Sequence, residues 1–304
     1  MRIQLDSFNE KTAARVADIE AGHIVPTEPR DAATVVVLRP AGAGGAGGAG
    51  GAAGTGGTGG TAGADVEVLM LRRTAAMRFA PGAYVFPGGA VDAADYGTEM
   101  GWQGPSPAEF GARLGASPDE ARALVCAAVR ETFEEAGVLL AGAPEGGPLA
   151  VPAGPDWAAD RAALTAGSLS LAELLARRGL LLRADLLVPW ARWIAPEGEP
   201  RRFDARFFAA ALPDGQRAAG HAAESDRIEW LRPAGAIAAA KAGEISLFPP
   251  TAATLNDFAS AVAAGQDVAD ILGTRRTIEP VQPRLVLEDG AAWLELPDAA
   301  GYPL

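Results

Sequence analysis

The chain has 304 residues, 49% of them hydrophobic, and a formal net charge of −12 with an isoelectric point near 4.7. The hydrophobic content is enough for a folded core, whereas the acidic charge argues against binding along a nucleic-acid backbone. Cys126 is the single cysteine, which excludes an internal disulfide. The sequence holds neither a signal-peptide pattern nor an uninterrupted apolar stretch of roughly eighteen residues. We therefore expect a globular, cytoplasmic protein with no nucleic-acid or membrane partner.

The N-terminal part predicts a lead-in followed by two strands. The lead-in covers residues 1–30, with a modest helical pattern over residues 12–21. Runs rich in Val and Leu predict strands at residues 34–39 and 66–72. Between the strands, residues 41–64 consist of Gly, Ala and Thr. This composition buries too little surface to offset the entropy of ordering, so it predicts a disordered loop.

A third apolar run is followed by glycines. Residues 84–86 predict a short strand that leads into a turn at Pro87, Gly88 and Gly89. Backbone amides and carbonyls are bare at glycines and can therefore meet an ion or a phosphate. Further along, residues 107–114 predict a helix.

The next stretch predicts the helix around which the chain is organised. Ser117 and Glu120 form a capping-box pattern, Pro118 occupies the first helical position, and Gly137 ends the helix. Its length is about five turns.

Negative charge gathers on one face of this helix. Glu131, Glu134 and Glu135 fall at i, i+3 and i+4, with Arg130 at the edge of the face. The opposite face carries Cys126, Val129, Phe133 and Ala136. Neighbouring like charges on a helix repel one another, and such dense oxygen ligands suit a hard cation such as Mg²⁺. The alternative is a solvated acidic face without a metal.

The second half of the chain alternates helices and strands. Helices are predicted at residues 158–167 and 170–179, and strands at residues 187–194 and 203–212. Two more helices and several short strands follow in residues 236–304, which we expect to wrap the sheet or to form a homodimer interface. The pattern as a whole predicts an α+β fold in which helices cover a mixed sheet.

Taken together, the glycine segment and the glutamate helix resemble the Nudix hydrolase signature. The resemblance lies in F-P-G-G at residues 86–89 and R-E-T-F-E-E-A-G-V at residues 130–138. The matching positions are Gly89, Arg130, Glu131, Glu134, Glu135, Gly137 and Val138. The resemblance implies a Nudix domain over residues 31–235, with the α/β/α sandwich of that family.

Two departures from the signature stand out. Gly89 and Arg130 are 41 residues apart, far more than in the family pattern, so we expect residues 90–116 to be an insertion that forms a helical cap. Arg122 occupies the position of the first glutamate of the signature, which leaves Asp92 or Asp95 as candidate partners for Arg130.

An insertion at this point is similar to that of the Nudix branch containing the peroxisomal coenzyme A and acyl-coenzyme A diphosphatases. That resemblance implies cleavage of a nucleotide-type small molecule, coenzyme A or its acyl derivatives, to adenosine 3′,5′-bisphosphate and a 4′-phosphopantetheine product. Two alternatives stay open. One is a Nudix pyrophosphatase for ADP-ribose, dinucleotides or nucleoside triphosphates, and the other is a nucleotide-binding module that has lost catalysis.

The family resemblance also implies roles for individual residues. Mg²⁺ or Mn²⁺ would be held by Glu131, Glu134, Glu135 and the carbonyl of Gly89. Glu131 or Glu224, the latter in a late loop, would accept the proton of the attacking water, and Arg130 would belong to the catalytic group. The implied substrate contacts are Arg72, Arg73, Arg78, Gly88 and Gly89.

Overall fold

The computed structural model describes residues 1–4, 10–42, 65–74, 81–96, 99–145, 147, 149–220, 225–288, 291–297 and 300–304. The predicted loop at residues 41–64 lies, from residue 43 onward, outside this part of the chain. The helices are α1 Glu10–Glu20, α2 Pro107–Leu114, α3 Pro118–Ala136, α4 Pro155–Thr165, α5 Leu171–Arg178, α6 Pro233–Lys241, α7 Pro249–Ala263 and α8 Val268–Gly273, with 3-10 turns η1 Ala93–Asp95 and η2 Ala184–Leu186. The strands are β1 Arg2–Gln4, β2 Arg30–Pro40, β3 Val66–Arg73, β4 Ala83–Val85, β5 Gly88–Ala90, β6 Trp102–Gln103, β7 Ala141–Gly142, β8 Leu181–Arg183, β9 Val188–Ile194, β10 Phe203–Ala211, β11 Ser225–Leu231, β12 Ser246–Leu247, β13 Pro280–Val281, β14 Arg284–Glu288 and β15 Ala291–Glu295.

A mixed sheet forms the centre of the molecule. Within the described residues nine strands join it, in the order β12-β4-β3-β2-β10-β9-β13, with β11 also paired to β3 and β5 to β2. Strands β2 and β10 run parallel, whereas β2 pairs antiparallel with both β3 and β5. The mixed pairing and the helices confirm the predicted α+β class.

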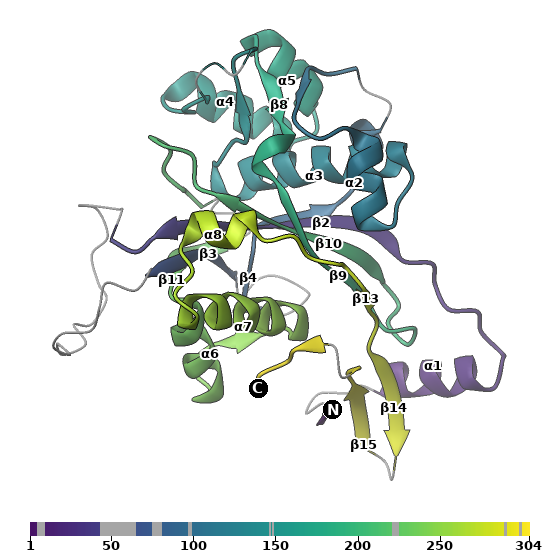
Figure 1. Ribbon diagram of the computed structural model, residues 1–304. Helices are drawn as coiled ribbons and strands as arrows, with labels where there is room; N and C mark the ends of the chain where they lie inside the picture. The colour runs from purple at the N-terminus through teal and green to yellow at the C-terminus, as the bar shows by residue number, and fades with distance from the viewer. Residues whose placement is uncertain are drawn as a thin grey trace, which may run out of the picture.

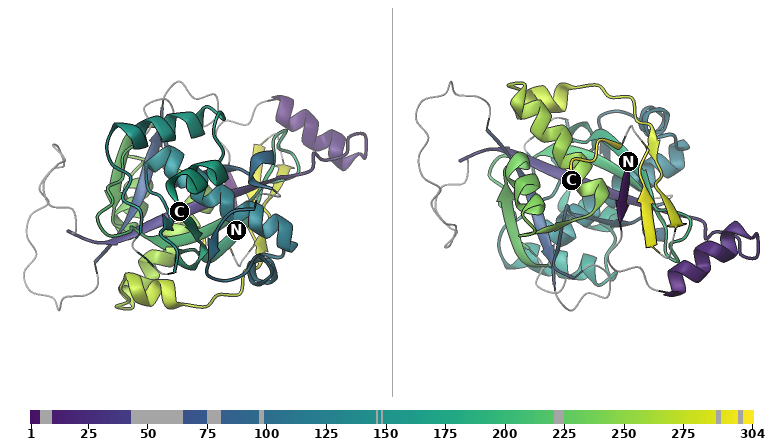
Figure 2. Two further views of the ribbon diagram at one scale, coloured as in Figure 1. Left: turned by 90° about the horizontal axis from the view of Figure 1, so that it is seen from above. Right: turned by 90° about the horizontal axis from the view of Figure 1, so that it is seen from below.

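Helices cover both faces of this sheet. Val35 and Val37 of β2 belong to the apolar core between the sheet and α3, and Val36 and Leu38 belong to the core between the sheet and α7. Side chains alternate between the two faces of a strand, so a strand that is covered on both sides reads as one continuous apolar run. Figure 1 shows α2 to α5 above the sheet and α6 and α7 below it, and the two views in Figure 2 show these layers from outside. This arrangement confirms the α/β/α sandwich.

The central helix α3 forms where its local signals predicted it. Ser117 Oγ accepts a hydrogen bond from the Glu120 amide, and Glu120 Oε2 accepts one from the Ser117 amide at 2.7 Å. Gly137 ends the helix in the left-handed region with φ 67°, a conformation that is costly for other residues. The helix therefore sets its own ends.

The C-terminal region reaches both edges of the sheet. Strand β12 pairs with β4 at one edge, and β13 pairs with β9 at the other. Strand β1 pairs with β15, so the two ends of the chain share a small three-stranded sheet with β14.

The predicted turn at Gly88 and Gly89 is wrong. Both residues belong to β5, which pairs with β2 through Thr34↔Gly88 and Ala33↔Gly89. A Cβ added at Gly88 would lie 2.5 Å from the carbonyl oxygen of Ala33, closer than atoms can pack. The glycines are required for close approach of β5 to its neighbours rather than for a turn.

The insertion packs into the core instead of forming a separate cap in its described residues. Helix α2 contains Phe110 and Leu114, which are buried in the same apolar cluster as α3. Trp102 packs edge-on against Phe110 and donates its indole N–H to the Pro105 carbonyl at 2.8 Å. Across the described part of the chain, no helix is both long and apolar enough to cross a bilayer.

Because α7 shares its core with the sheet, Phe258→Ala should destabilise the whole fold. Phe258 is fully buried and stacks on Trp190 of β9, with 4.4 Å between the ring centroids. We expect the free energy of unfolding to fall by about 3–5 kcal/mol in urea titrations. Phe203→Ala is the control, because Phe203 is 40% exposed and should change it by only about 0.5 kcal/mol. Equal losses for the two variants would contradict this packing.

Candidate functional site

The acidic face of α3 lies against the backbone of β5. Glu135 Oε2 accepts a hydrogen bond from the Gly88 amide at 3.0 Å. Glu131 lies so close to Gly89 that a Cβ added there would be 2.4 Å from its Oε1 atom. The structure thus brings together Gly88, Gly89 and the glutamates, although Gly89 and Arg130 are 41 positions apart in the sequence.

Arg130 is the hub of this contact. Its Nε and Nη2 atoms donate to the two carboxylate oxygens of Asp95 at 3.0 and 2.8 Å, and Nη2 also donates to the Ala90 carbonyl at 3.0 Å. On the other side, Nη1 donates to Glu131 Oε1 at 2.8 Å and to Glu134 Oε1 at 3.4 Å. Of the two predicted partners of Arg130, the structure therefore selects Asp95.

The charges around Arg130 determine its protonation. Burial by itself would lower the pKa of Arg130, but the hydrogen bonds that it donates to Asp95 and the charge of Glu131 raise it overall. The guanidinium is therefore cationic at every physiological pH.

Negative charge nevertheless exceeds positive charge at this place. Arg161 of α4 donates from Nε to the Glu134 carbonyl at 2.8 Å, and its charge interacts with Glu134 and Glu135. Burial lowers the pKa of Arg161. Two guanidiniums thus face four carboxylates, of which Glu131 and Glu134 are only 15% and 13% exposed. Sequence reasoning missed Arg161, because nothing in its local sequence indicates where α4 packs.

The donor atoms of this cluster fit a hard divalent cation. All are carboxylate or carbonyl oxygens, the ligands that Mg²⁺ and Mn²⁺ prefer. Within the part of the chain that the structure describes, however, no three acidic, histidine or cysteine side chains converge as a metal site. Arg130 lies between Glu131 and Glu134, and Glu135 is turned toward the Gly88 amide.

The predicted arginines do not act as one group. Arg72 lines the same side of β3 as Met70, which belongs to the core beneath α7, while alternation along the strand places Arg73 on the side of α3. Arg72 forms an ion pair with Asp226 at 2.7 Å. Arg78 and Glu224 lie outside the described residues.

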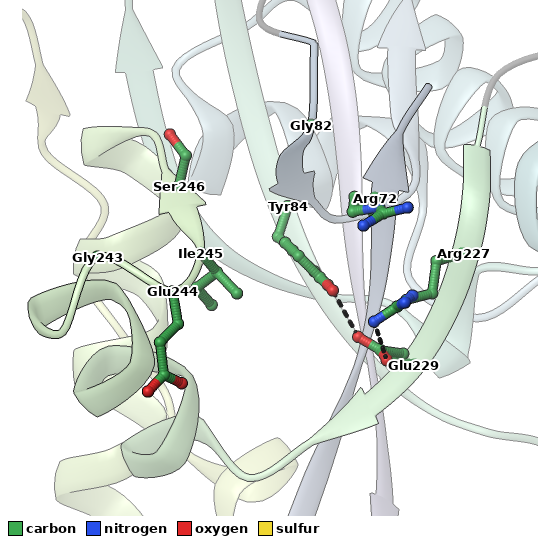
Figure 3. A pocket seen from close by; sticks show the side chains of 9 residues that line it. All are labelled: Arg72, Gly82, Tyr84, Arg227, Glu229, Gly243, Glu244, Ile245 and Ser246. Carbon is green, nitrogen blue, oxygen red and sulfur yellow. Dashed lines mark hydrogen bonds and ion pairs between the residues drawn. The ribbon is translucent and has the colours of Figure 1, made fainter. Parts of the chain in front are cut away.

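A pocket of about 750 Å³ opens beside Arg72 on the face away from α3. It is lined by Arg72, Tyr84, Arg227 and Glu229 from the sheet and by residues 243–246, which form the loop after α6 and the start of β12 (Figure 3). Tyr84 Oη donates to Glu229 Oε2 at 2.7 Å, and Arg227 Nη1 lies 3.3 Å from Glu229 Oε1. Burial and this hydrogen bond raise the pKa of Tyr84. The volume is typical of a small-molecule site.

Sequence reasoning missed the pocket because it depends on long-range strand pairing. Tyr84 and Arg227 lie opposite Arg72 on the two neighbours of β3. The alternation of charged and apolar residues from Arg227 to Trp230 is the local signal that could have indicated a strand with one polar face.

Comparisons with known proteins agree with this geometry. A family model described as the NUDT19 Nudix domain matches residues 106–257, half of the chain. The chain is 32% identical over 183 residues to putative nudix hydrolase 7 of Caenorhabditis elegans, covering 60% of this chain and 52% of that protein. It is 30% identical over 232 residues to acyl-coenzyme A diphosphatase NUDT19 of Gallus gallus, covering 61% of this chain and 59% of that protein. The chain thus spans between half and three fifths of the length of these curated relatives.

A solved structure extends the likeness to most of the chain. The crystal structure of a NUDIX hydrolase from Alicyclobacillus acidocaldarius superposes with a TM-score of 0.60 at 32% identity, covering 83% of this chain and 98% of that chain. These comparisons confirm the resemblance stated from the sequence motif and the expected fold.

Cys126, on the face of α3 opposite the glutamates, is expected to be unreactive because it is buried. Cys126 is fully buried, and burial raises the pKa of its thiol to about 12. Because only the thiolate is nucleophilic, we expect iodoacetamide at pH 8 to leave the native protein unmodified and to label it fully in denaturant, as followed by mass spectrometry. Rapid alkylation of the native protein would contradict this burial.

Proposed function

The chain belongs to the Nudix hydrolase family, and we propose that it is a diphosphatase that cleaves coenzyme A or acyl-coenzyme A with the aid of a divalent cation. The products would be adenosine 3′,5′-bisphosphate and 4′-phosphopantetheine or its acyl derivative. The observation that carries the reaction class is the crowding of Glu131, Glu134 and Glu135 against β5 around one arginine. The name of the relative from Gallus gallus supports the substrate class.

The cation is the cofactor we assign to the acidic cluster. Nudix hydrolases generally depend on a divalent metal ion, and we propose Mg²⁺ or Mn²⁺ held by Glu131, Glu134, Glu135 and the Gly89 carbonyl. When bound, the ion neutralises the charge that builds on the phosphate oxygens and makes water a better nucleophile.

Side chains of the protein itself then act on the attacking water and bind the diphosphate. Glu131 or Glu224 accepts the proton of the attacking water. Arg73 and Arg78 contact the diphosphate, for which a guanidinium is a good bidentate partner.

We assign the pocket beside Arg72 to an anionic part of the same substrate. Arg72 and Arg227 are opposite one another on adjacent strands, and an anionic group bound between them would replace the carboxylates of Asp226 and Glu229 as their partners. Tyr84 in the pocket and Gly88 at the glutamates are four positions apart in the chain, a length of at most about 14 Å. Because the pocket lies on the face of the sheet away from α3, a ligand that occupies both places has to pass around the sheet.

One assay distinguishes the proposed function from the alternatives by the substrates that are cleaved. A panel of coenzyme A, acetyl-coenzyme A, ADP-ribose, a dinucleoside polyphosphate and nucleoside triphosphates with Mn²⁺, read by mass spectrometry, separates them. Release of the bisphosphate only from the coenzyme A compounds supports our proposal. Cleavage of another member favours a different Nudix pyrophosphatase, and nucleotide binding without any turnover favours a module that has lost catalysis, as the replacement at Arg122 suggested.

Removing either of two carboxylates should abolish turnover. Glu134→Gln and Glu135→Gln keep the size of the side chain but remove its charge, so we expect kcat/KM for bisphosphate release to fall by about 100-fold or more. Glu173→Gln is the matched control, because Glu173 caps α5 and glutamine serves equally well in a capping box. Unchanged turnover in both test variants would rule out the proposed role of this cluster.

The pocket predicts a change in KM alone. Arg227→Ala removes a substrate contact that is the same in the ground state and the transition state, so KM should rise about tenfold while kcat stays constant. The control is Arg232→Ala, since the side chain of Arg232 is 61% exposed, against 51% for Arg227, but pairs with Asp65 outside the pocket. A KM equal to that of the control would show that the substrate does not enter this pocket.

A further inference from the structure

The insertion contributes a buried carboxylate to the site. We propose that Asp95 is a positioning residue, which holds Arg130 and through it the carboxylate of Glu131 and the carbonyl of Ala90. In the family signature a glutamate stands at the position of Arg122, whereas in this chain the insertion supplies a carboxylate that pairs with Arg130. The inference rests on the proposed metal-dependent function and identifies a residue that supports it.

The pair between Asp95 and Arg130 is not a surface ion pair. The side chain of Asp95 is 2% exposed and that of Arg130 is 12% exposed. Both carboxylate oxygens of Asp95 accept from the guanidinium, in the bidentate geometry that fixes orientation as well as distance. The plane of the Arg130 guanidinium is therefore set by Asp95.

The backbone around Asp95 fixes its own carboxylate in turn. Asp92 Oδ1 accepts from the Ala94 amide at 2.9 Å, and Asp95 Oδ2 accepts from the Asp92 amide at 2.8 Å, which together form the capping box of η1. The Val91 amide donates to the Asp31 carbonyl at 2.9 Å and ties this segment to β2. Asp95 thus stands on backbone that is anchored to the sheet.

Arg130 transmits this order to the glutamates. Its Nη2 atom holds the carbonyl of Ala90, the residue after Gly89, and its Nη1 atom holds Glu131 Oε1. The negative charge of Asp95 also compensates the positive charge of Arg130. Without that carboxylate the guanidinium would be compensated by Glu131 and Glu134 alone, and it would compete with a cation for their oxygens.

The residue at the vacated position has a different partner. The guanidinium of Arg122 lies over the ring of Trp102, 5.5 Å from its centroid, a cation–π contact to the insertion. Asp95 with Arg130 and Trp102 with Arg122 thus both join the insertion to the helix.

The experiment measures Mn²⁺ binding in the absence of substrate. Electron paramagnetic resonance of free Mn²⁺ gives the dissociation constant for the full chain and its variants. Asp95→Asn should weaken binding about tenfold or more, the effect expected when the partner of a metal-site residue is lost. Arg130→Lys, which keeps the charge but not the bidentate geometry, should give a smaller loss and serves as the second variant if Asp95→Asn does not fold.

The control is Asp204→Asn. Asp204 is also buried and binds Arg192 in a bidentate pair, with 3.0 and 2.7 Å between the atoms. It should lose thermal stability in the same way as Asp95→Asn but keep the Mn²⁺ affinity of the wild type.

A double-variant cycle tests whether Asp95 acts through Arg130. If it does, Asp95→Asn combined with Arg130→Lys weakens Mn²⁺ binding by less than the product of the separate factors. Three results would each overturn the positioning role. The double variant could lose Mn²⁺ affinity by the full product of the two separate factors, Asp95→Asn could bind Mn²⁺ as tightly as the wild type, or the wild type could bind no Mn²⁺. Loss of Mn²⁺ affinity in Asp95→Asn together with no cleavage of coenzyme A by the wild type would instead leave the positioning role standing and refute the proposed substrate.

Discussion

The structure depends on the contact between the acidic face of α3 and the backbone of β5. A helix face that carries three carboxylates can pack on a sheet only where the sheet offers hydrogen-bond donors and no intervening side chains. Gly88 and Gly89 meet both conditions, since the Gly88 amide binds Glu135 and Gly89 leaves room for Glu131. Because Gly88 is also in close contact with β2, these glycines set the spacing of three elements at once.

The two faces of the sheet have different chemistry. Successive residues of β3 point to opposite faces, so Arg72 and Arg73, although adjacent in the chain, serve different places. The face of α3 concentrates negative charge around Arg130, whereas the opposite face offers Arg72 and Arg227 in a pocket. A scissile diphosphate suits the face of α3 only with the proposed divalent cation between it and the glutamates, because both are negatively charged.

The elements with local signals were predicted well. Capping boxes at Ser117 and Ser170 involve residues only three positions apart, so the starts of α3 and α5 follow from sequence alone. Strand β5 could not be recognised, because its identity comes from pairing with β2 and not from its own side chains. The D-A-A-D segment does contain a local capping signal, but only the packing of η1 against α3 directs Asp95 toward Arg130. The same limit applies to the pocket, which requires β11, β3 and the loop after α6 to meet.

An insertion within the motif is tolerable because α3 does not depend on the preceding chain for its start. Its capping box, its proline and its buried face define where it begins and which side faces the sheet. The register of the glutamates over β5 therefore comes from packing, and residues can be added between β5 and α3 without changing it. The added segment offsets part of its own ordering entropy by burying Phe110 and Leu114 of α2 in the core beside α3. What the insertion must preserve is the charge balance at Arg130. Asp95, in the first turn of the inserted segment, preserves this charge balance by pairing with Arg130. Position 122 can therefore hold an arginine, which contacts Trp102 of the inserted segment.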